Sequence, residues 1–153
     1  MKKHTTKNEK ETLALAKILL NDFNDNNVFA LTGNLGSGKT TFTKGLGKSL
    51  KIKENILSPT FNIMRVYNIP INKKNKYKYL CHIDAYRLQS FDDLKDLGIN
   101  NYFKSPETLT IIEWADKIKG FLPKNTVFID FKIGKKETER IIYTTVPKTQ
   151  SDS

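Results

Sequence analysis

One short stretch of the sequence combines the residue types that bind phosphate groups. Residues 33–40 read GNLGSGKT and match the pattern G-x-x-x-x-G-K-[ST] in full. The glycines allow the backbone to curl so that its N–H groups point inward around an anion. Lys39 can then neutralise oxygens of the β- and γ-phosphates, and the Thr40 hydroxyl can ligate Mg²⁺. A chance match is expected in well under about one in a hundred chains of this length at ordinary glycine usage, so the pattern predicts a nucleoside triphosphate site.

Two carboxylates are placed to assist such a site. A phosphate loop usually works with an acidic residue that ends a neighbouring strand and positions Mg²⁺ or its waters. Asp84 closes the apolar run YLCHID, and Glu113 closes TLTIIE. Because ligands of an open α/β sheet bind where its strands end, both are candidates for the metal. An exposed strand-end carboxylate or a helix cap is the alternative for each.

Further polar and aromatic candidates lie close to these in the sequence. Ser58 and Thr60 precede a strand pattern, where a hydroxyl can turn toward the γ-phosphate as a switch element does; an ordinary loop hydroxyl is the alternative. Trp114 directly follows Glu113, and the sequence alone favours core packing for it over a place in the site. His82 lies two residues before Asp84 on the same strand face, and we interpret it as structural rather than catalytic.

Strand and helix patterns that alternate along the chain must position these groups. Strand-like runs cover 28–32, 60–67, 76–84, 108–114, 125–133 and 139–146, and helix-like runs cover 9–21, 39–50, 91–98 and 115–122. This alternation predicts an α/β fold, a P-loop NTPase-like three-layer sandwich with a mixed, mainly parallel central sheet. The last two runs, joined across GKKET, predict a C-terminal antiparallel hairpin. In the helix at 9–21, Leu13, Ala16, Lys17 and Leu20 follow helical spacing.

Length, charge and cysteine usage narrow the class of protein. The 153 residues suit one domain, which we place at 1–146 with a flexible tail at 147–153. No apolar run approaches the roughly 20 residues of a membrane span, and the N-terminus lacks the apolar core of a secretion signal. The single cysteine, Cys81, excludes an internal disulfide and a multi-cysteine metal site. These features predict a cytoplasmic protein without a membrane partner.

Other functions compatible with a phosphate loop or a basic chain are less well supported. A GTPase is disfavoured because no Asn-Lys-x-Asp segment occurs. A small kinase that phosphorylates a metabolite or nucleotide fits the length, but such enzymes use several arginines and this chain has three, Arg65, Arg87 and Arg140. The net charge of +10 permits a nucleic-acid-binding module. We interpret it instead as a preference for lysine, with charges scattered over solvated faces.

Five segments in order carry a resemblance to a known family. They read GNLGSGKTTF, SPTFNIMRVY, HIDAYRL, DLGINNYF and IIEWADKI. In this order and spacing they resemble the bacterial TsaE family, also called YjeE, the ATPases of tRNA threonylcarbamoyladenosine biosynthesis. The resemblance runs from about residue 10 to residue 146, and only the phosphate loop is specific when taken alone.

The resemblance implies an activity and its partners. It implies a P-loop fold and a cytoplasmic, Mg²⁺-dependent ATPase with low activity on its own. Family members bind the TsaD–TsaB complex, which transfers a threonylcarbamoyl group to N6 of the adenosine next to the anticodon of tRNAs reading codons that begin with A. They support repeated turnover of that complex with ATP and do not perform the transfer. The tRNA is then contacted only through the complex. The isolated chain is expected to be a monomer or a weak dimer.

Carried over motif by motif, the resemblance implies roles for the candidate residues. Lys39, Asp84 and Thr60 would be the catalytic groups, Asp84 acting on the attacking water and Thr60 as a switch-like hydroxyl. Thr40, Glu113 and Asp84 would hold Mg²⁺ or its waters. The nucleotide would contact a larger set, namely Thr12, Asn34, Leu35, Gly36, Ser37, Gly38, Lys39, Thr40, Thr41, Trp114 and Arg140.

Two of these nucleotide contacts lie far from the phosphate loop in the sequence. The chain also departs from the family pattern at two positions. Thr12 would approach the adenine, and Arg140, which opens the last strand, would reach the nucleotide. Asn34 stands where an acidic residue is common, and IIEWADKI lacks the proline that often follows the tryptophan. Neither departure touches a proposed ligand of phosphate or metal.

Overall fold

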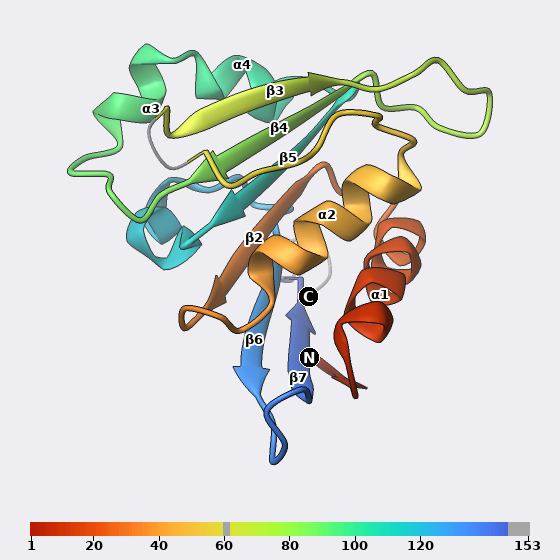
Figure 1. Cartoon of the computed structure of the whole chain (residues 1–153). Helices are drawn as coiled ribbons and strands as arrows, with labels where there is room; N and C mark the ends of the chain where they lie inside the picture. The colour runs from red at the N-terminus through yellow and green to blue at the C-terminus, as the bar shows by residue number, and fades with distance from the viewer. Residues whose placement is uncertain (60–61, 147–153) are drawn as a thin grey trace, which may run out of the picture.

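The computed structural model describes residues 1–59 and 62–146, which form one mixed sheet with helices on both faces (Figure 1). Its strands are β1 (Lys2–Thr6), β2 (Val28–Gly33), β3 (Met64–Asn68), β4 (Tyr79–Asp84), β5 (Thr108–Glu113), β6 (Val127–Ile133) and β7 (Arg140–Thr145). Its helices are α1 (Glu9–Asp22), α2 (Lys39–Ser49), α3 (Asp92–Asp96), α4 (Ile99–Lys104) and the 3-10 helix η1 (Ala115–Phe121). The predicted tail at 147–153 lies outside the described residues.

The sheet has a parallel centre and antiparallel edges. The strand order is β1-β7-β6-β2-β5-β4-β3, in which β6, β2, β5 and β4 run parallel. β7 and β1 continue the sheet antiparallel on one side, and β3 does so on the other. The expected mixed sheet and the hairpin of β6 and β7 are therefore confirmed. Strand β1 was not anticipated, because its polar sequence KKHTT carries no apolar alternation. Helix α4 was not anticipated either.

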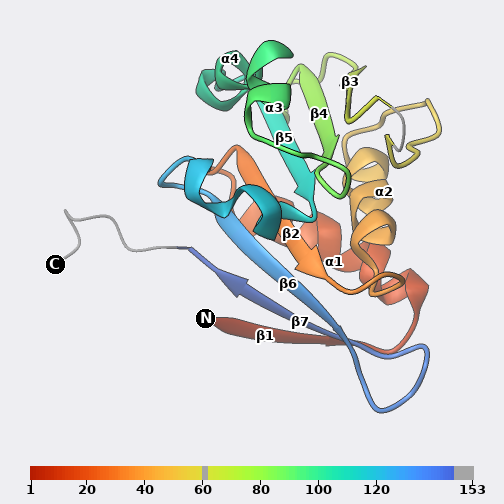
Figure 2. The same cartoon turned by 90° about the vertical axis from the view of Figure 1, so that its left-hand side faces the viewer.

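Two apolar cores, one on each face, make the fold a three-layer sandwich (Figure 2). Along β2, Phe29 and Leu31 join the core under α1 and α2, whereas Val28 and Ala30 join the core under α3, α4 and η1. Successive strand residues point to opposite faces, so a central strand covered on both faces is apolar throughout. The short run VFALT is therefore apolar because β2 is buried on both faces. This packing on both faces holds the end of β2 in place.

Helix α1 is correctly predicted, but its buried face is not. The helix begins after Asn8, whose side-chain oxygen accepts from the Glu11 N–H at 2.9 Å. Its buried residues are Thr12, Leu15, Ala16 and Leu19; Leu13 and Leu20 are only half-buried, and Lys17 is exposed. On this face Leu15, Ala16 and Leu19 join the core under α1 and α2, and the Thr12 hydroxyl bonds that of Thr6 in β1 at 2.7 Å.

The segment around Gly98 also differs from expectation. The predicted helix at 91–98 is α3, which ends at Asp96. Gly98 has φ 81° and directly precedes a further helix, α4, rather than ending a structured region. A glycine with positive φ fits either the end of one helix or the turn into the next, which is why the sequence does not distinguish the two.

The cysteine provides a test of the core. Cys81 is fully buried on β4, and burial raises the pKa of its thiol to about 12. Because the thiolate is the reactive form, we expect the native protein at pH 8 to react with a disulfide reagent about a thousandfold more slowly than the unfolded chain. Labelling with and without guanidinium measures this ratio; equally fast labelling would show that the β4 core opens readily.

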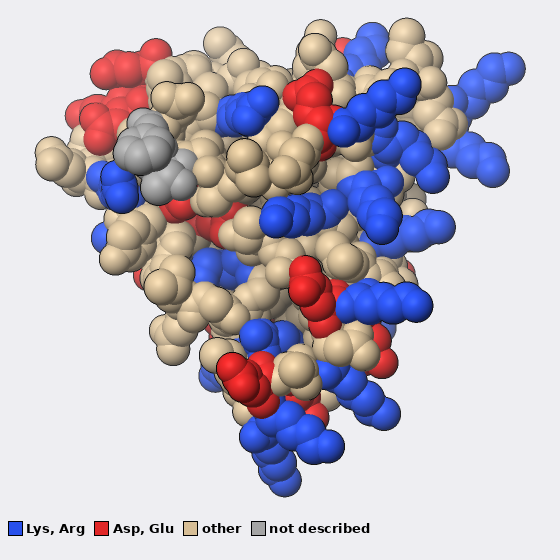
Figure 3. Space-filling model, in the orientation of Figure 1, with Lys and Arg blue, Asp and Glu red and all other residues tan. Residues whose placement is uncertain are grey.

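Positive charge is concentrated on one part of the surface. Residues 40–83 carry nine lysines or arginines and one carboxylate, Glu54, and thus +8 of the net charge of +10. All nine cationic side chains are exposed, and Figure 3 shows basic side chains gathered over the α2 side and the β3–β4 loop. The charges lie on solvated faces as expected, but this segment carries most of the net positive charge. In the described residues, none of the helices has the length and apolar character needed to cross a membrane.

Candidate nucleotide-binding site

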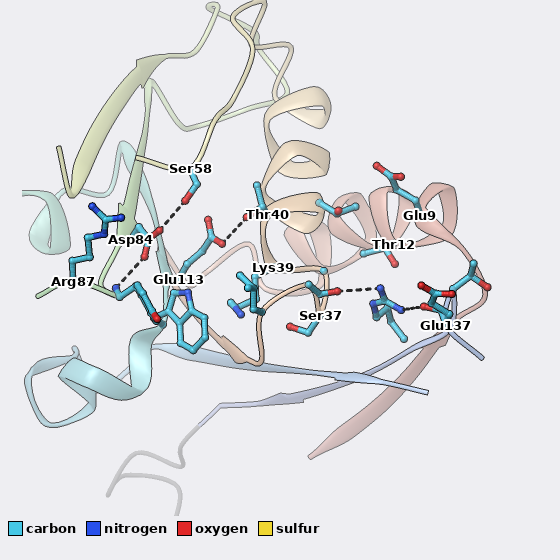
Figure 4. A pocket seen from close by; sticks show the side chains of 18 of the residues that line it. Glu9, Thr12, Ser37, Lys39, Thr40, Ser58, Asp84, Arg87, Glu113 and Glu137 are labelled. Carbon is cyan, nitrogen blue, oxygen red and sulfur yellow. Dashed lines mark hydrogen bonds between the residues drawn. The ribbon is translucent and has the colours of Figure 1, made fainter. Parts of the chain in front are cut away.

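The carboxyl ends of the central strands meet at a cavity of about 710 Å³ (Figure 4). The parallel register places Glu113 of β5 beside Leu31 of β2 on one side and Asp84 of β4 on the other. The loop after β2 and the first turn of α2 form the floor. This edge is where open α/β sheets bind ligands, and it brings together segments that are far apart in the sequence.

The loop between β2 and α2 has the backbone that its glycines predict. Gly33, Gly36 and Gly38 have φ values of 141°, 77° and 109°, a region that side chains other than glycine rarely adopt. A Cβ on Gly33 would lie 2.5 Å from the Phe131 carbonyl oxygen of β6. Gly38 caps α2, so the positive end of the helix dipole faces the cavity.

Lys39 projects across this loop. Its Nζ donates to the carbonyl oxygens of Gly33 at 2.5 Å and Asn34 at 3.0 Å, and it lies 4.1 Å from the centre of the Trp114 ring. Burial lowers the pKa of Lys39, while nearby carboxylates, Glu113 first among them, partly oppose this effect. The ammonium is therefore poorly solvated, and an anion in the cavity would be a favourable partner for it.

Glu113 links the loop to the sheet. Its Oε1 accepts from the Thr40 hydroxyl at 2.8 Å, and its Oε2 lies 2.5 Å from His82 Nε2. Both Glu113 and His82 are buried. Thr40 and Glu113 thus present two hard oxygen ligands next to each other, beside the phosphate loop.

Asp84 is held on the opposite side of the cavity from Lys39's loop. Its Oδ2 accepts from the Ser58 hydroxyl at 2.8 Å, and its Oδ1 accepts from the Tyr86 N–H at 3.0 Å. A carboxylate offers about four lone-pair positions, and the partners of Asp84 among the described residues take two of them. Ser58, one of the two hydroxyls considered for a switch element, is therefore in contact with the acidic candidate.

Trp114 both lines the cavity and packs against the core under α3, α4 and η1. It has φ 58° and precedes η1, and its ring lies 4.9 Å from that of Tyr86. Positive φ at a bulky residue is strained and concentrates at functional sites. The expectation of core packing is therefore correct in part, and a role for the ring in the site stays a prediction.

The other end of the cavity lies between α1 and the β6–β7 turn. Arg140 NH2 donates to the Gly36 carbonyl oxygen at 3.0 Å, and its NH1 donates to those of Glu137 and Glu139 at 2.5 and 3.0 Å. Arg140 thus ties the turn to the phosphate loop. Thr12 lines the same end from α1.

Most candidate residues line this one cavity. It is lined by Thr12, Leu35, Gly36, Ser37, Gly38, Lys39, Thr40, Thr41, Asp84, Glu113, Trp114 and Arg140. Asn34 is not among its lining residues, since its side chain is exposed and only its carbonyl takes part. Thr60 lies outside the described residues. Their roles in binding and catalysis stay predictions.

Sequence reasoning missed several further lining residues. These are Glu9, Ile63, Tyr86, Arg87, Glu137 and Thr138. Tyr86 and Arg87 follow Asp84 in HIDAYRL, so the motif itself was a usable signal. Glu9, Glu137 and Thr138 carry no local signal, because only the packing of α1 and of the β6–β7 turn around the loop brings them there.

The residues fit a nucleotide phosphate and Mg²⁺. The Ser37 hydroxyl is buried in the loop and has no hydrogen-bond partner among the described residues, as expected of a group that awaits a ligand. In the same residues no cluster of three or more His, Cys, Asp or Glu could enclose a metal. Mg²⁺ typically takes one or two protein oxygens together with substrate phosphates, which is the set that Thr40 and Glu113 offer.

The fold defines an α/β protein with one mixed sheet, whose candidate site lies at the glycine-rich loop between β2 and α2. The family model described as threonylcarbamoyl adenosine biosynthesis protein TsaE matches residues 6–142. The chain belongs to the TsaE family.

Individual relatives agree with this assignment. A Bacillus subtilis protein named tRNA threonylcarbamoyladenosine biosynthesis protein TsaE is 36% identical over 144 residues, 94% of this chain and 85% of the relative. A Rickettsia typhi protein of the same name is 35% identical over 131 residues, 85% of each chain. The crystal structure of Bacillus subtilis YdiB superposes with a TM-score of 0.70 at 33% identity, covering 95% of this chain and 85% of that one.

Proposed function

We propose that this protein binds and slowly hydrolyses ATP with Mg²⁺, and thereby supports formation of the threonylcarbamoyl group on N6 of the adenosine next to the anticodon of tRNA. The observation that carries the ATPase part is the phosphate loop with Lys39 inside it and the Thr40–Glu113 pair beside it. The tRNA part rests on membership of the TsaE family. Relatives named for tRNA threonylcarbamoyladenosine biosynthesis cover most of this chain.

Each group in the cavity has a task in this proposal. The loop N–H groups and the Lys39 ammonium bind the β- and γ-phosphates and offset the charge that develops as the terminal bond breaks. Mg²⁺, when bound at Thr40 and Glu113, supplies further neutralisation of the same phosphates. An oxygen of Asp84 accepts the proton of the attacking water. Trp114 excludes solvent beside the Lys39 ammonium.

The arginines explain why the isolated chain would be slow. A transition-state arginine is worth roughly 10³–10⁵ in phosphoryl-transfer rate. Arg140 is bonded to three backbone carbonyl oxygens, so its guanidinium is not directed at a transferring phosphate, and Arg87, the other arginine that lines the cavity, is engaged in an interaction of its own. Groups from partners would then complete the site. The proposed partners are homologues of TsaD and TsaB, reached in the cytoplasm, with tRNA contacted through their complex and this chain a monomer or weak dimer alone.

A reconstitution tests the proposal. With limiting TsaD–TsaB, threonylcarbamoyl-adenylate, tRNA and ATP, we expect many modified tRNAs per complex with the intact chain and about one without it. The Lys39→Ala variant should behave like the omission. Equal turnover in all three reactions would refute the accessory role, and a phosphorylated metabolite in place of free phosphate would instead establish the kinase alternative.

The concentration of charge in residues 40–83 calls for one companion measurement. Binding of tRNA to the isolated chain should be weak at physiological salt if tRNA is met only through the complex. Tight binding that falls steeply with salt would show direct backbone contact with RNA, and would assign that contact to the basic surface.

A further inference from the structure

His82 is a fully buried polar residue next to the candidate site. It sits on β4 with a side-chain exposure of 0%, and its Nε2 lies 2.5 Å from Oε2 of Glu113. Because an ionised carboxylate has no proton to give, Nε2–H is the donor. The pair connects through Oε1 of Glu113 to the Thr40 hydroxyl. A continuous chain of hydrogen bonds therefore runs from the buried sheet to the phosphate loop.

The two oxygens of Glu113 are divided between these neighbours. A carboxylate this far from water must have hydrogen-bond donors, and Thr40 and His82 provide one to each oxygen. If His82 were absent, Oε2 would have to turn toward another donor, and Oε1 would move with it. The orientation of the carboxylate plane toward Thr40 thus depends on His82.

A purely structural histidine does not account for this arrangement. The second ring nitrogen of His82, Nδ1, is buried without a hydrogen-bond partner among the described residues. A buried polar atom without a partner is unfavourable, so an apolar side chain of similar volume would serve the core better. What the imidazole provides there is the Nε2–H aimed at Glu113.

We propose that His82 is a positioning residue that holds the Glu113 carboxylate in the orientation needed for Thr40 and for a divalent cation beside the phosphates. This inference rests on the proposed function, since it assumes that Thr40 and Glu113 face Mg²⁺. Donors that hold a metal ligand from behind commonly raise metal affinity about 10- to 100-fold. His82 acts through Glu113 and touches neither nucleotide nor metal.

The experiment measures ADP affinity with Mg²⁺ and with chelator, in wild type and two variants. His82→Met keeps the volume and removes the donor, whereas His82→Gln offers an amide N–H near the position of Nε2. We expect His82→Met to leave affinity in chelator unchanged and to weaken the binding of Mn²⁺, used as the spectroscopic probe in the ADP complex, about 10- to 100-fold. His82→Gln should recover most of the loss. The matched control is His4→Gln, because His4 is the other histidine and lies on β1.

The outcomes separate this inference from the proposed function. Wild-type ADP binding without any dependence on Mg²⁺ would contradict the metal site itself. Wild-type dependence that persists unchanged in His82→Met would overturn the role of His82 alone, as would an equal loss with Mg²⁺ and with chelator. Should His82→Met fail to fold, the ¹⁵N spectrum of the wild-type imidazole decides. Its Nε2–H signal should shift when Mg²⁺ joins the ADP complex, and an unchanged signal would overturn the proposal.

Discussion

Replacing Lys39 by alanine is expected to weaken ATP binding about 10- to 150-fold, the equivalent of the ~1.5–3 kcal/mol of one charge-assisted hydrogen bond. The Lys39 ammonium is buried at the loop and bonds only carbonyl oxygens and an aromatic face. Phosphate oxygens would give it an anionic partner in surroundings where water is scarce. Alanine leaves the loop N–H groups in place, so binding should weaken without disappearing.

The single tryptophan allows a direct measurement. Trp114 is the only one in the chain, and its ring lies 4.1 Å from Lys39 Nζ, so intrinsic fluorescence should report occupancy of the cavity. Lys44→Ala is the matched control, since Lys44 is an exposed lysine of the same helix. Unchanged ATP affinity in Lys39→Ala would show that the Lys39 ammonium does not bind the phosphates.

The parts of this site that could be predicted from the sequence are those encoded by local patterns. The phosphate loop is local, since its glycines, lysine and threonine lie within one turn-and-helix segment. Asp84 and Glu113 were identified because each ends an apolar run, and parallel strands bring such ends to one edge. The final hairpin of β6 and β7 is local in the same sense, since its two strands are joined by one short turn.

The parts that could not be predicted depend on contacts between distant segments. His82 was interpreted as a structural histidine because the sequence gives no sign that β5 places Glu113 against its Nε2. The buried face of α1 includes Thr12, which bonds β1, a strand with no apolar pattern of its own. Arg140 lines the cavity, and its contact with the nucleotide stays a prediction; its bonds to carbonyl oxygens of the loop and turn were not predicted from the sequence. In all three cases a hydrogen bond across the fold is involved, and single-segment periodicity carries no information about it.

Asp84→Asn is expected to lower ATP hydrolysis about 10²- to 10⁴-fold, the usual range for loss of a general base, and to leave ATP affinity nearly unchanged. Asparagine has the shape of aspartate, so its Oδ1 can still accept from the Tyr86 N–H. The Ser58 hydroxyl, which now donates to Oδ2, can turn and accept from the new amide. The geometry around residue 84 is thus preserved while the charge and the proton acceptor are lost.

Single-turnover phosphate release with TsaD–TsaB present, together with Trp114 fluorescence, measures both quantities on one sample. Asp130→Asn is the matched control, because Asp130, like Asp84, accepts from a side-chain hydroxyl, that of Thr32 at 2.9 Å. Unlike Asp84, it lies outside the cavity lining. Hydrolysis unaffected by Asp84→Asn would remove Asp84 from the chemical step. A parallel loss of Mg²⁺-dependent affinity would instead make Asp84 a metal ligand. The metal would then be held by Asp84 of β4 together with Glu113 of β5, which lies beside it in register and is bonded to Thr40.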